Sequence, residues 1–277
     1  DLSIDRIYPT IDEPLHIAKP VGRDGLWVAG KQIYRIDLQH DTVDTFKLGN
    51  PQSQVIALAV DAEGSVWASY PDGGLWKYAE SSAYVSHRQP LAALGKANEK
   101  IQVVLPDGDS DWIGSASGLY RLRHSDDHIE SIEVVGHQPV YSLLRDREGG
   151  IWVGQKYRLL RLKDNRIEES YELDEQHRSL FARVESIAQD HNNDIWFTIG
   201  DVGIHHVDRQ RKQLSINPAW LPMNLRRSGQ PLVRSNKDGK VLFENKPKIA
   251  DTAPIIQKYL DLIRRALKDV VLRGTGR

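Results

Sequence analysis

The 277-residue chain contains no cysteine. It therefore cannot form a disulfide bond, bind a metal through thiolates or use a cysteine nucleophile. Long apolar runs are also missing, since no stretch approaches the roughly 18 apolar residues that a membrane-spanning helix needs. Hydrophobic residues make up 40% and charged residues 27% of the chain, which is typical of a globular protein and excludes the disordered and membrane-embedded classes.

Net charge is also nearly absent, but the value of -1 hides an uneven distribution. Residues 221–277 hold 13 Lys and Arg against 5 Asp and Glu, whereas residues 1–220 hold 24 and 33. All seven tryptophans lie in the acidic part. Charge and composition therefore both predict a domain boundary near Leu221.

Tryptophan recurs in apolar, glycine-flanked segments at steps of 40, 45, 40 and 44 residues. The recurring residues are Trp27, Trp67, Trp112, Trp152 and Trp196. In the fourth unit, alternating or apolar segments predict strands over 140–145, 151–154, 159–162 and 167–173. A period of about 40 to 45 residues with four short strands is typical of one β-propeller blade. Each repeated Trp is expected to pack between blades rather than to serve as a ligand platform.

The repeat resembles a known family in two places. The segment from Ser142 to Gly154 reads SLLRDREGGIWVG, and Trp112-Ile113-Gly114 is followed by Gly118-Leu119-Tyr120-Arg121-Leu122. Both are similar to the two-component regulator propeller repeat, and the likeness extends over about residues 16–220. It implies a ligand-sensing input domain, as in the extracytoplasmic sensors of bacterial hybrid histidine kinases and some diguanylate cyclases. It also implies a periplasmic or other extracytoplasmic location.

The predicted fold is an all-β propeller over residues 1–220 with five clear repeats. A weaker echo at 232–243 carries Phe243 where the other units carry Trp, and it is either a degenerate sixth blade or an unrelated hairpin. A five-bladed ring, a six-bladed ring and a slice of a larger ring all remain open.

The basic extension, residues 221–277, is predicted to contain the hairpin at 232–243 and an amphipathic helix at 251–272. The apolar stripe of this helix indicates docking on its own protein, or alternatively dimerisation and signal transmission. Residues 259–267 are also similar to the opening helix of macrocin O-methyltransferase-like proteins. That likeness implies an alternative function, as the accessory propeller of an enzyme whose catalytic domain is missing.

Motifs for catalysis or metal binding are weak. Three carboxylates between Asp107 and Asp111 resemble the start of a calcium loop, but Gly118 stands where the final Glu is needed. His205 and His206 are expected on opposite faces of a strand, which disfavours joint binding of one metal. No Gly-x-Ser-x-Gly elbow exists. We therefore expect no catalytic residue, metal or cofactor, with a propeller lyase using His and a metal as the remaining enzyme alternative.

Ligand-binding residues are expected in the loops that follow the Trp strands, because propellers bind through their connecting turns. The candidates are Tyr70, Asp72, Lys156, Tyr157 and Asp201, and the expected ligand is a small molecule, glycan or peptide. Trp76 and Trp220 fall outside the Trp register and are expected to be more exposed, although Trp76 aligns with Tyr120. The basic tail is expected to be a solvated charge run, so no nucleic acid partner is predicted, and any membrane contact would be made by parts outside this chain.

Overall fold

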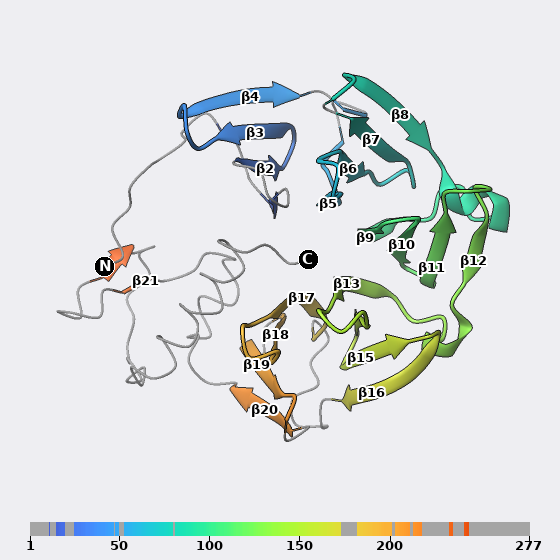
Figure 1. The fold of residues 1–277 in the computed structure, drawn as a ribbon, viewed down its shortest axis with the longest axis vertical. Helices are drawn as coiled ribbons and strands as arrows, with labels where there is room; N and C mark the ends of the chain where they lie inside the picture. Colours follow the sequence, from blue (N-terminus) through green and yellow to red (C-terminus); the bar gives the residue numbers. More distant parts are fainter. Residues whose placement is uncertain are drawn as a thin grey trace.

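The computed structural model describes residues 11, 15–19, 25–46, 48–49, 53–79, 81–172, 182–200, 203–210, 213–217, 233–234 and 241–243. Five four-stranded antiparallel sheets follow one another around a central opening, which is the architecture of a β-propeller (Figure 1). The all-β prediction is confirmed. The helices found among these residues are two short 3-10 turns, η1 (Pro90–Leu94) and η2 (Glu133–Val135).

Each blade contains four strands in sequence order. Blade 1 holds β1 (His16–Ala18), β2 (Leu26–Ala29), β3 (Ile33–Asp37) and β4 (Thr42–Phe46). Blade 2 holds β5 (Ala57–Val60), β6 (Val66–Ser69), β7 (Leu75–Ala79) and β8 (Tyr84–Arg88). Blade 3 holds β9 (Ile101–Asp107), β10 (Ser110–Ser115), β11 (Gly118–Arg123) and β12 (Ile129–Ser131). Blade 4 holds β13 (Val140–Arg145), β14 (Ile151–Gln155), β15 (Arg158–Lys163) and β16 (Arg166–Glu172), and blade 5 holds β17 (Val184–Gln189), β18 (Ile195–Ile199), β19 (Gly203–Asp208) and β20 (Gln213–Asn217).

The first strand of each blade lies nearest the central opening and the fourth lies at the outer edge (Figure 1). Inner strands of successive blades contact each other in the order β1, β5, β9, β13 and β17. Beyond blade 5, β21 (Val233–Arg234) pairs with β22 (Val241–Phe243) inside the region where a hairpin is expected. The helix predicted over 251–272 and Trp220 lie outside the described residues, and the domain boundary at 220 stays a prediction.

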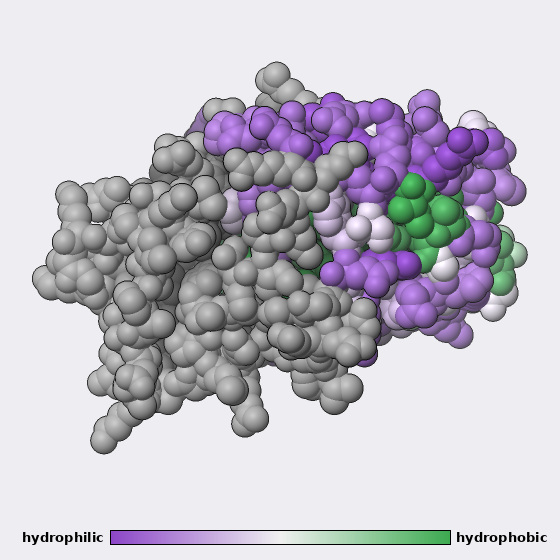
Figure 2. Space-filling view, turned by 90° about the horizontal axis from the view of Figure 1, so that it is seen from below, coloured by the Kyte–Doolittle hydropathy of each residue, from purple (hydrophilic) through white to green (hydrophobic). Residues whose placement is uncertain are grey.

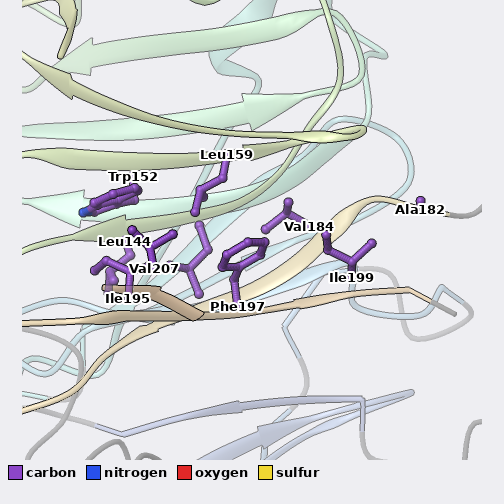
Figure 3. Packing of buried hydrophobic residues seen from close by; sticks show 10 residues of the cluster. Leu144, Trp152, Leu159, Ala182, Val184, Ile195, Phe197, Ile199 and Val207 are labelled. Atoms are coloured by element: carbon purple, nitrogen blue, oxygen red, sulfur yellow. The ribbon is translucent and has the colours of Figure 1, made fainter. Parts of the chain in front are cut away.

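Tryptophans fill the interfaces between blades. The five repeat tryptophans have exposed fractions between 0% and 7%, and each lies in the second strand of its blade. Between blades 4 and 5, Trp152, Leu144 and Leu159 pack against Val184 and Phe197 of the next blade (Figure 3). Trp76, which lies outside this register, is half-buried, and its ring contacts that of His87 in a tilted arrangement with the centroids 4.5 Å apart. Burial of large apolar surface at each interface is the main force that joins the blades.

A carboxylate holds each tryptophan from blade 2 onward. The indole Nε1 of Trp152 donates to Asp146 Oδ2 at 2.9 Å, while Asp146 Oδ1 accepts the backbone N–H of Gly150 at 2.8 Å. The indole bond repeats in the pairs Asp61–Trp67, Asp107–Trp112 and Asp190–Trp196. In blades 2 and 5 the aspartate also accepts a backbone N–H of its turn, from Ser65 and Asp194 respectively. One aspartate therefore both closes the acidic turn and satisfies the only polar group of the buried indole ring.

A basic side chain lies opposite every one of these tryptophans. The cross-strand partners from the third strand are Arg35, Lys77, Arg121, Arg161 and His206. Lys77 Nζ lies 4.6 Å from the Trp67 ring centroid and 3.0 Å from Asp61 Oδ2. Arg121 likewise lies over the Trp112 ring, Arg161 pairs with Asp146, and His206 stacks on Trp196. Contacts of the basic residue with the ring or with the aspartate therefore explain the alternating apolar and basic residues of the third strand.

In blades 3 and 4 the second residue after the tryptophan is glycine, because the next blade approaches it closely. A Cβ atom at Gly154 would lie 2.1 Å from Ser142 Oγ and 2.7 Å from Val184 Cγ1 of blade 5. A Cβ atom at Gly114 would lie 2.7 Å from Val140 Cγ1 of blade 4. The glycine in the Trp-x-Gly sequence therefore has a steric cause, which is the close packing of inner strands.

The Asp146→Ala variant tests the aspartate unit. It removes the acceptor of the Trp152 indole and deprives Arg161, which is 3% exposed, of the fully buried carboxylate that pairs with its Nε. We expect the free energy of unfolding to fall by about 3 kcal/mol, because a buried cation loses a buried partner. Urea denaturation measures the loss. The control is Asp109→Ala at an exposed turn position, with an expected change within about 0.5 kcal/mol; equal losses in both variants would contradict the proposed role of Asp146.

Blade 3 contains a buried carboxylate of a different kind. Asp111 in β10 is 0% exposed, and its Oδ2 lies 2.7 Å from Nε2 of His124. Burial raises the pKa of Asp111. The hydrogen bond from His124 and the charge of Lys77 lower this pKa, but by less, so the net shift is upward. Ionised Asp111 therefore costs folding free energy, and His124 offsets part of that cost.

This carboxylate predicts a pH dependence of stability. An acid whose pKa is raised by folding contributes most below its unfolded pKa of about 3.9, and its contribution falls as the pH rises through the folded pKa. We expect the stability of the wild type relative to Asp111→Asn to decrease from about pH 4 to about pH 7. Urea denaturation across this range measures it, and a constant or rising difference would contradict the assignment.

Candidate functional site

The two ends of the blades carry different kinds of loop. The acidic turns lie at one end, and antiparallel order places the loops between second and third strands at the other, together with the connections between blades. Four of the predicted ligand residues lie at this second end, in the loops after β6 and β14: Tyr70, Asp72, Lys156 and Tyr157. Asp201 lies outside the described residues.

Tyr70 is part of the packing of its loop. Its side chain is 2% exposed, its hydroxyl donates to the carbonyl oxygen of Leu48, and burial raises its pKa to about 12. The ring fills the space beside Gly49, where a Cβ atom would lie 2.5 Å from it. Asp72 is exposed, and its Oδ1 accepts the backbone N–H of Gly74 at 2.9 Å. In blade 2 these residues therefore shape the loop, and Tyr70 joins it to the connection from blade 1.

Polar groups at the same end of blade 3 satisfy one another. Lys96 Nζ donates to Ser117 Oγ at 2.8 Å and to the Tyr120 hydroxyl at 2.5 Å, and Ser115 Oγ donates to Glu99 at 2.7 Å. The Tyr120 hydrogen bond raises the pKa of Lys96. Burial raises the pKa of Glu99, but hydrogen bonds from the two serines outweigh burial and lower it. This cluster fixes the connection between blades 2 and 3.

Three inner strands carry a β-bulge at this end. In blade 4, Val140 pairs with Gln155 and Ser142 with Gly154, so Tyr141 is an extra residue. The same shift makes Gln102 the extra residue in blade 3 and Glu185 the extra residue in blade 5. Bulges interrupt strand pairing and redirect side chains, and they are common at rims and beside functional sites.

The corresponding residues of the first two blades are Leu15 and Ile56. Their N–H groups donate to the second-strand carbonyls of Ala29 at 2.8 Å and Ser69 at 2.9 Å, respectively. Leu15, Ile56, Gln102, Tyr141 and Glu185, which we call the mouth positions, therefore share one place in the repeat at the loop end of the channel. Their side chains are of four chemical kinds: two are aliphatic, and the others are an amide, a phenol and a carboxylate. The repeat varies here while its blade-building positions stay constant.

Charged and aromatic side chains gather around two mouth positions. Arg183 Cζ lies 5.2 Å from the Tyr141 ring centroid, and Arg183 Nε lies 3.1 Å from Glu185 Oε1. Lys156 forms an isolated antiparallel bridge with Arg183, and its Nζ lies 4.9 Å from the Tyr157 ring centroid. We call Tyr141, Lys156, Tyr157, Arg183 and Glu185 the mouth cluster. It unites blade 4 with blade 5.

The structure thus brings together two of the predicted ligand residues, Lys156 and Tyr157. Tyr70 and Asp72 belong to blade 2, which blade 3 separates from this cluster. Sequence reasoning missed Tyr141, Arg183 and Glu185. The available signal was the changing chemistry at the start of each inner strand, but an extra residue in a strand leaves no clear mark on its hydrophobic pattern.

Backbone strain occurs inside the mouth cluster. Tyr157 has a φ of 63°, in the left-handed region that non-glycine residues rarely occupy. Its N–H donates to the carbonyl of Ala182 at 3.3 Å, and the carbonyl of Arg183 accepts the N–H of Gly200 at 3.1 Å. The loop of blade 4 is therefore held against the start of β17 by main-chain contacts, which keep Lys156 beside Arg183.

Apolar exposure does not single out another site. Figure 2 shows a side of the molecule where the described surface is mainly hydrophilic and carries one hydrophobic area. The exposed large apolar residues are spread around the ring: Leu15, Ile17, Tyr84, Val85, Leu94, Val134 and Ile167. Within the described ranges, no group of three His, Asp or Glu residues is arranged to hold a metal ion. His205 lies against Phe197 and His206 against Trp196, on opposite faces of β19.

Blades 4 and 5 are tied at their acidic-turn end. Arg147 Nη1 donates to the carbonyl of Asp190 at 2.6 Å and to Asn193 Oδ1 at 3.1 Å. Arg209 Nη2 of blade 5 lies 2.9 Å from Glu169 Oε1 and 3.1 Å from Glu148 Oε2 of blade 4. Several charge-assisted bonds therefore hold one end of this interface, while the mouth cluster occupies the other end.

Comparison with known proteins agrees with this architecture. Residues 135–156, which include Tyr141 and Trp152, match the family model for the two-component regulator propeller, so the resemblance noted in the sequence is confirmed. No curated protein sequence matches the chain. In the part of the chain that the structure describes, no helix is long and apolar enough to cross a membrane.

Solved structures with the same fold include two bacterial extracellular domains. That of the putative hybrid two component system BT3049 from B. thetaiotaomicron has a TM-score of 0.62 and 16% identity, covering 80% of this chain and 30% of that one. That of BT4673 from the same organism has a TM-score of 0.56 and 20% identity, covering 70% and 27%. Virginiamycin B lyase from Staphylococcus aureus has a TM-score of 0.60 and 14% identity, covering 76% and 71%. The chain spans less than a third of the two extracellular domains, and likeness at these identities shows the fold alone.

The Tyr70→Phe variant separates a structural from a binding role. It leaves the buried carbonyl of Leu48 without its hydroxyl donor, so we expect the free energy of unfolding to fall by about 1 kcal/mol. Tyr84→Phe is the matched control, because Tyr84 is 64% exposed on the outer strand β8 and should change stability little. Urea denaturation compares the two. An unchanged stability in Tyr70→Phe would show that the hydroxyl does not anchor the loop.

Proposed function

We propose that this chain is part of the ligand-sensing propeller of a bacterial signal-transduction protein, acts outside the cytoplasm and has no catalytic activity of its own. The match to the two-component regulator propeller supports the signalling class, and the extracellular relatives support the location. One observation carries the proposal: the side chains at the five equivalent mouth positions are of four chemical kinds, whereas the framework of the blades is repeated. Variation confined to one end of a rigid scaffold is typical of a binding surface.

The position of the mouth cluster suggests how binding becomes a signal. A ligand over Tyr141 and Arg183 contacts blades 4 and 5 at once, so it binds best at one spacing of these blades. Ligands shift a conformational equilibrium only through such differential affinity. Several charge-assisted bonds of Arg147 and Arg209 tie the acidic-turn end of this interface, whereas the mouth end is joined by the Lys156–Arg183 bridge and one main-chain bond at 3.3 Å. A change in spacing would therefore occur mainly at the mouth. The predicted helix at 251–272 would carry this change onward, by docking or by dimerisation.

Ligand-induced thermal stabilisation tests the proposal. Glycan and peptide fragments are screened against the full 277-residue chain and against Tyr141→Ala. A ligand at about 100 times its Kd should stabilise the wild type by about 2.7 kcal/mol, and this effect should disappear in Tyr141→Ala. The control Tyr84→Ala, on the far outer edge of blade 2, should respond like the wild type. A ligand that stabilises all three proteins equally would place binding away from the mouth and contradict the proposal.

Blade spacing provides a second readout of the same experiment. The chain lacks cysteine, so Ser170→Cys in blade 4 and Ser186→Cys near the mouth end of blade 5 introduce two unique labelling sites at exposed positions. A ligand that acts through the interface should change the distance distribution between spin labels at these sites. Binding with an unchanged distribution would retain a binding function but contradict transmission through blades 4 and 5.

A further inference from the structure

The mouth cluster contains two positive charges on neighbouring strands. Lys156 and Arg183 face each other in an antiparallel bridge. Directly opposed residues of such a pair project on the same face, with Cβ atoms about 5 Å apart. Like charges in this arrangement repel and destabilise the pair. An isolated bridge between two cations is therefore unfavourable unless something neutralises it.

Neutralisation within the described residues is incomplete. Glu185 pairs with Arg183 through Nε at 3.1 Å, so one carboxylate opposes two cations. Among the residues that the structure describes, no carboxylate pairs with Lys156, whose Nζ lies over the Tyr157 ring. The terminal nitrogens of Arg183 likewise have no carboxylate partner among those residues. The cluster therefore keeps a net charge of about +1, and its two cations belong to directly opposed residues.

We propose that the mouth cluster binds a small molecule through a carboxylate group, held between Lys156 Nζ and the terminal nitrogens of Arg183. The planar guanidinium matches a carboxylate in geometry, and Lys156 adds a second charge. Glu185 disfavours a doubly charged group such as a phosphate monoester, because the second negative charge would be repelled. The exposed part of the Tyr141 ring provides an apolar surface for the rest of the ligand. This inference rests on the proposed sensing function and specifies the ligand class of that site.

Affinity measurements with matched probes test the inference on the full chain. The acidic probes are a trimer of galacturonic acid and tri-glutamate, and their neutral counterparts are a trimer of galactose and tri-glutamine. We expect an acidic probe to bind at least about tenfold more tightly than its neutral counterpart, with an affinity that falls as salt is added. Binding of only the saccharide, or of only the peptide, identifies the source of the carboxylate.

Substitutions with opposite expected signs make the test specific. Lys156→Met should weaken binding of the acidic probe about tenfold, because a charge-assisted bond is lost. Glu185→Gln should strengthen it about fivefold, because a competing negative charge is removed. The controls are Lys163→Met at the opposite end of β15 and Glu130→Gln on β12, both exposed, which should leave affinity unchanged. A purely structural role of the cluster would not produce opposite shifts.

The outcomes distinguish this inference from the function on which it rests. Any one of four results would overturn the carboxylate inference. They are equal binding of acidic and neutral probes, no effect of Lys156→Met, weaker binding in Glu185→Gln, and no binding of either acidic probe at low salt. In the first of these cases, loss of binding in Tyr141→Ala would keep sensing at the mouth intact. Binding that persists unchanged in Tyr141→Ala would overturn the proposed site itself.

Discussion

The hydrogen bond from a tryptophan indole to the aspartate of the preceding turn is the interaction on which the rest of the structure depends. It fixes the largest side chain of each interface in one position, as Trp152 is fixed by Asp146. The same carboxylate closes the turn through Gly150 and pairs with Arg161 of the third strand. Three of the four strands of a blade are thereby joined at one point, so this end of the blade tolerates little change.

The opposite end has no comparable unit, and this asymmetry explains where the repeat can vary. Each loop there is stabilised by its own contacts: Tyr70 on Gly49 in blade 2, Lys96 with Tyr120 in blade 3, and main-chain bonds in blade 4. Because no shared carboxylate or buried ring is required, the mouth positions can differ from blade to blade. The residues that determine the fold and the residues of the proposed binding site therefore lie at opposite ends of the same strands.

The sequence predicted the blades because their determinants are local. The Trp period, the acidic turn and the alternating third strand each lie within a few residues, and the four strands of blade 4 appear where the pattern placed them. The mouth cluster could not be predicted in the same way, because it depends on long-range contacts. Tyr141 meets Arg183 only after two blades pack, and burial of Tyr70 depends on Gly49, from the preceding blade. Loop position indicated the correct end of the propeller, but not which side chains meet there.

The interface between blades 4 and 5 combines both kinds of constraint. At the turn end, Arg209 reaches across to Glu169 and Glu148, and buried hydrophobic residues fill the middle. At the mouth, Lys156 and Arg183 place two cations side by side with one carboxylate. The turn end of this interface is held by several ion pairs, whereas the mouth end has an excess positive charge. A negatively charged ligand would therefore interact mainly with the mouth end. In the proposed mechanism, the residues that build the fold therefore also keep the turn end of the interface fixed, and the variable residues at the mouth determine which ligand changes the blade spacing.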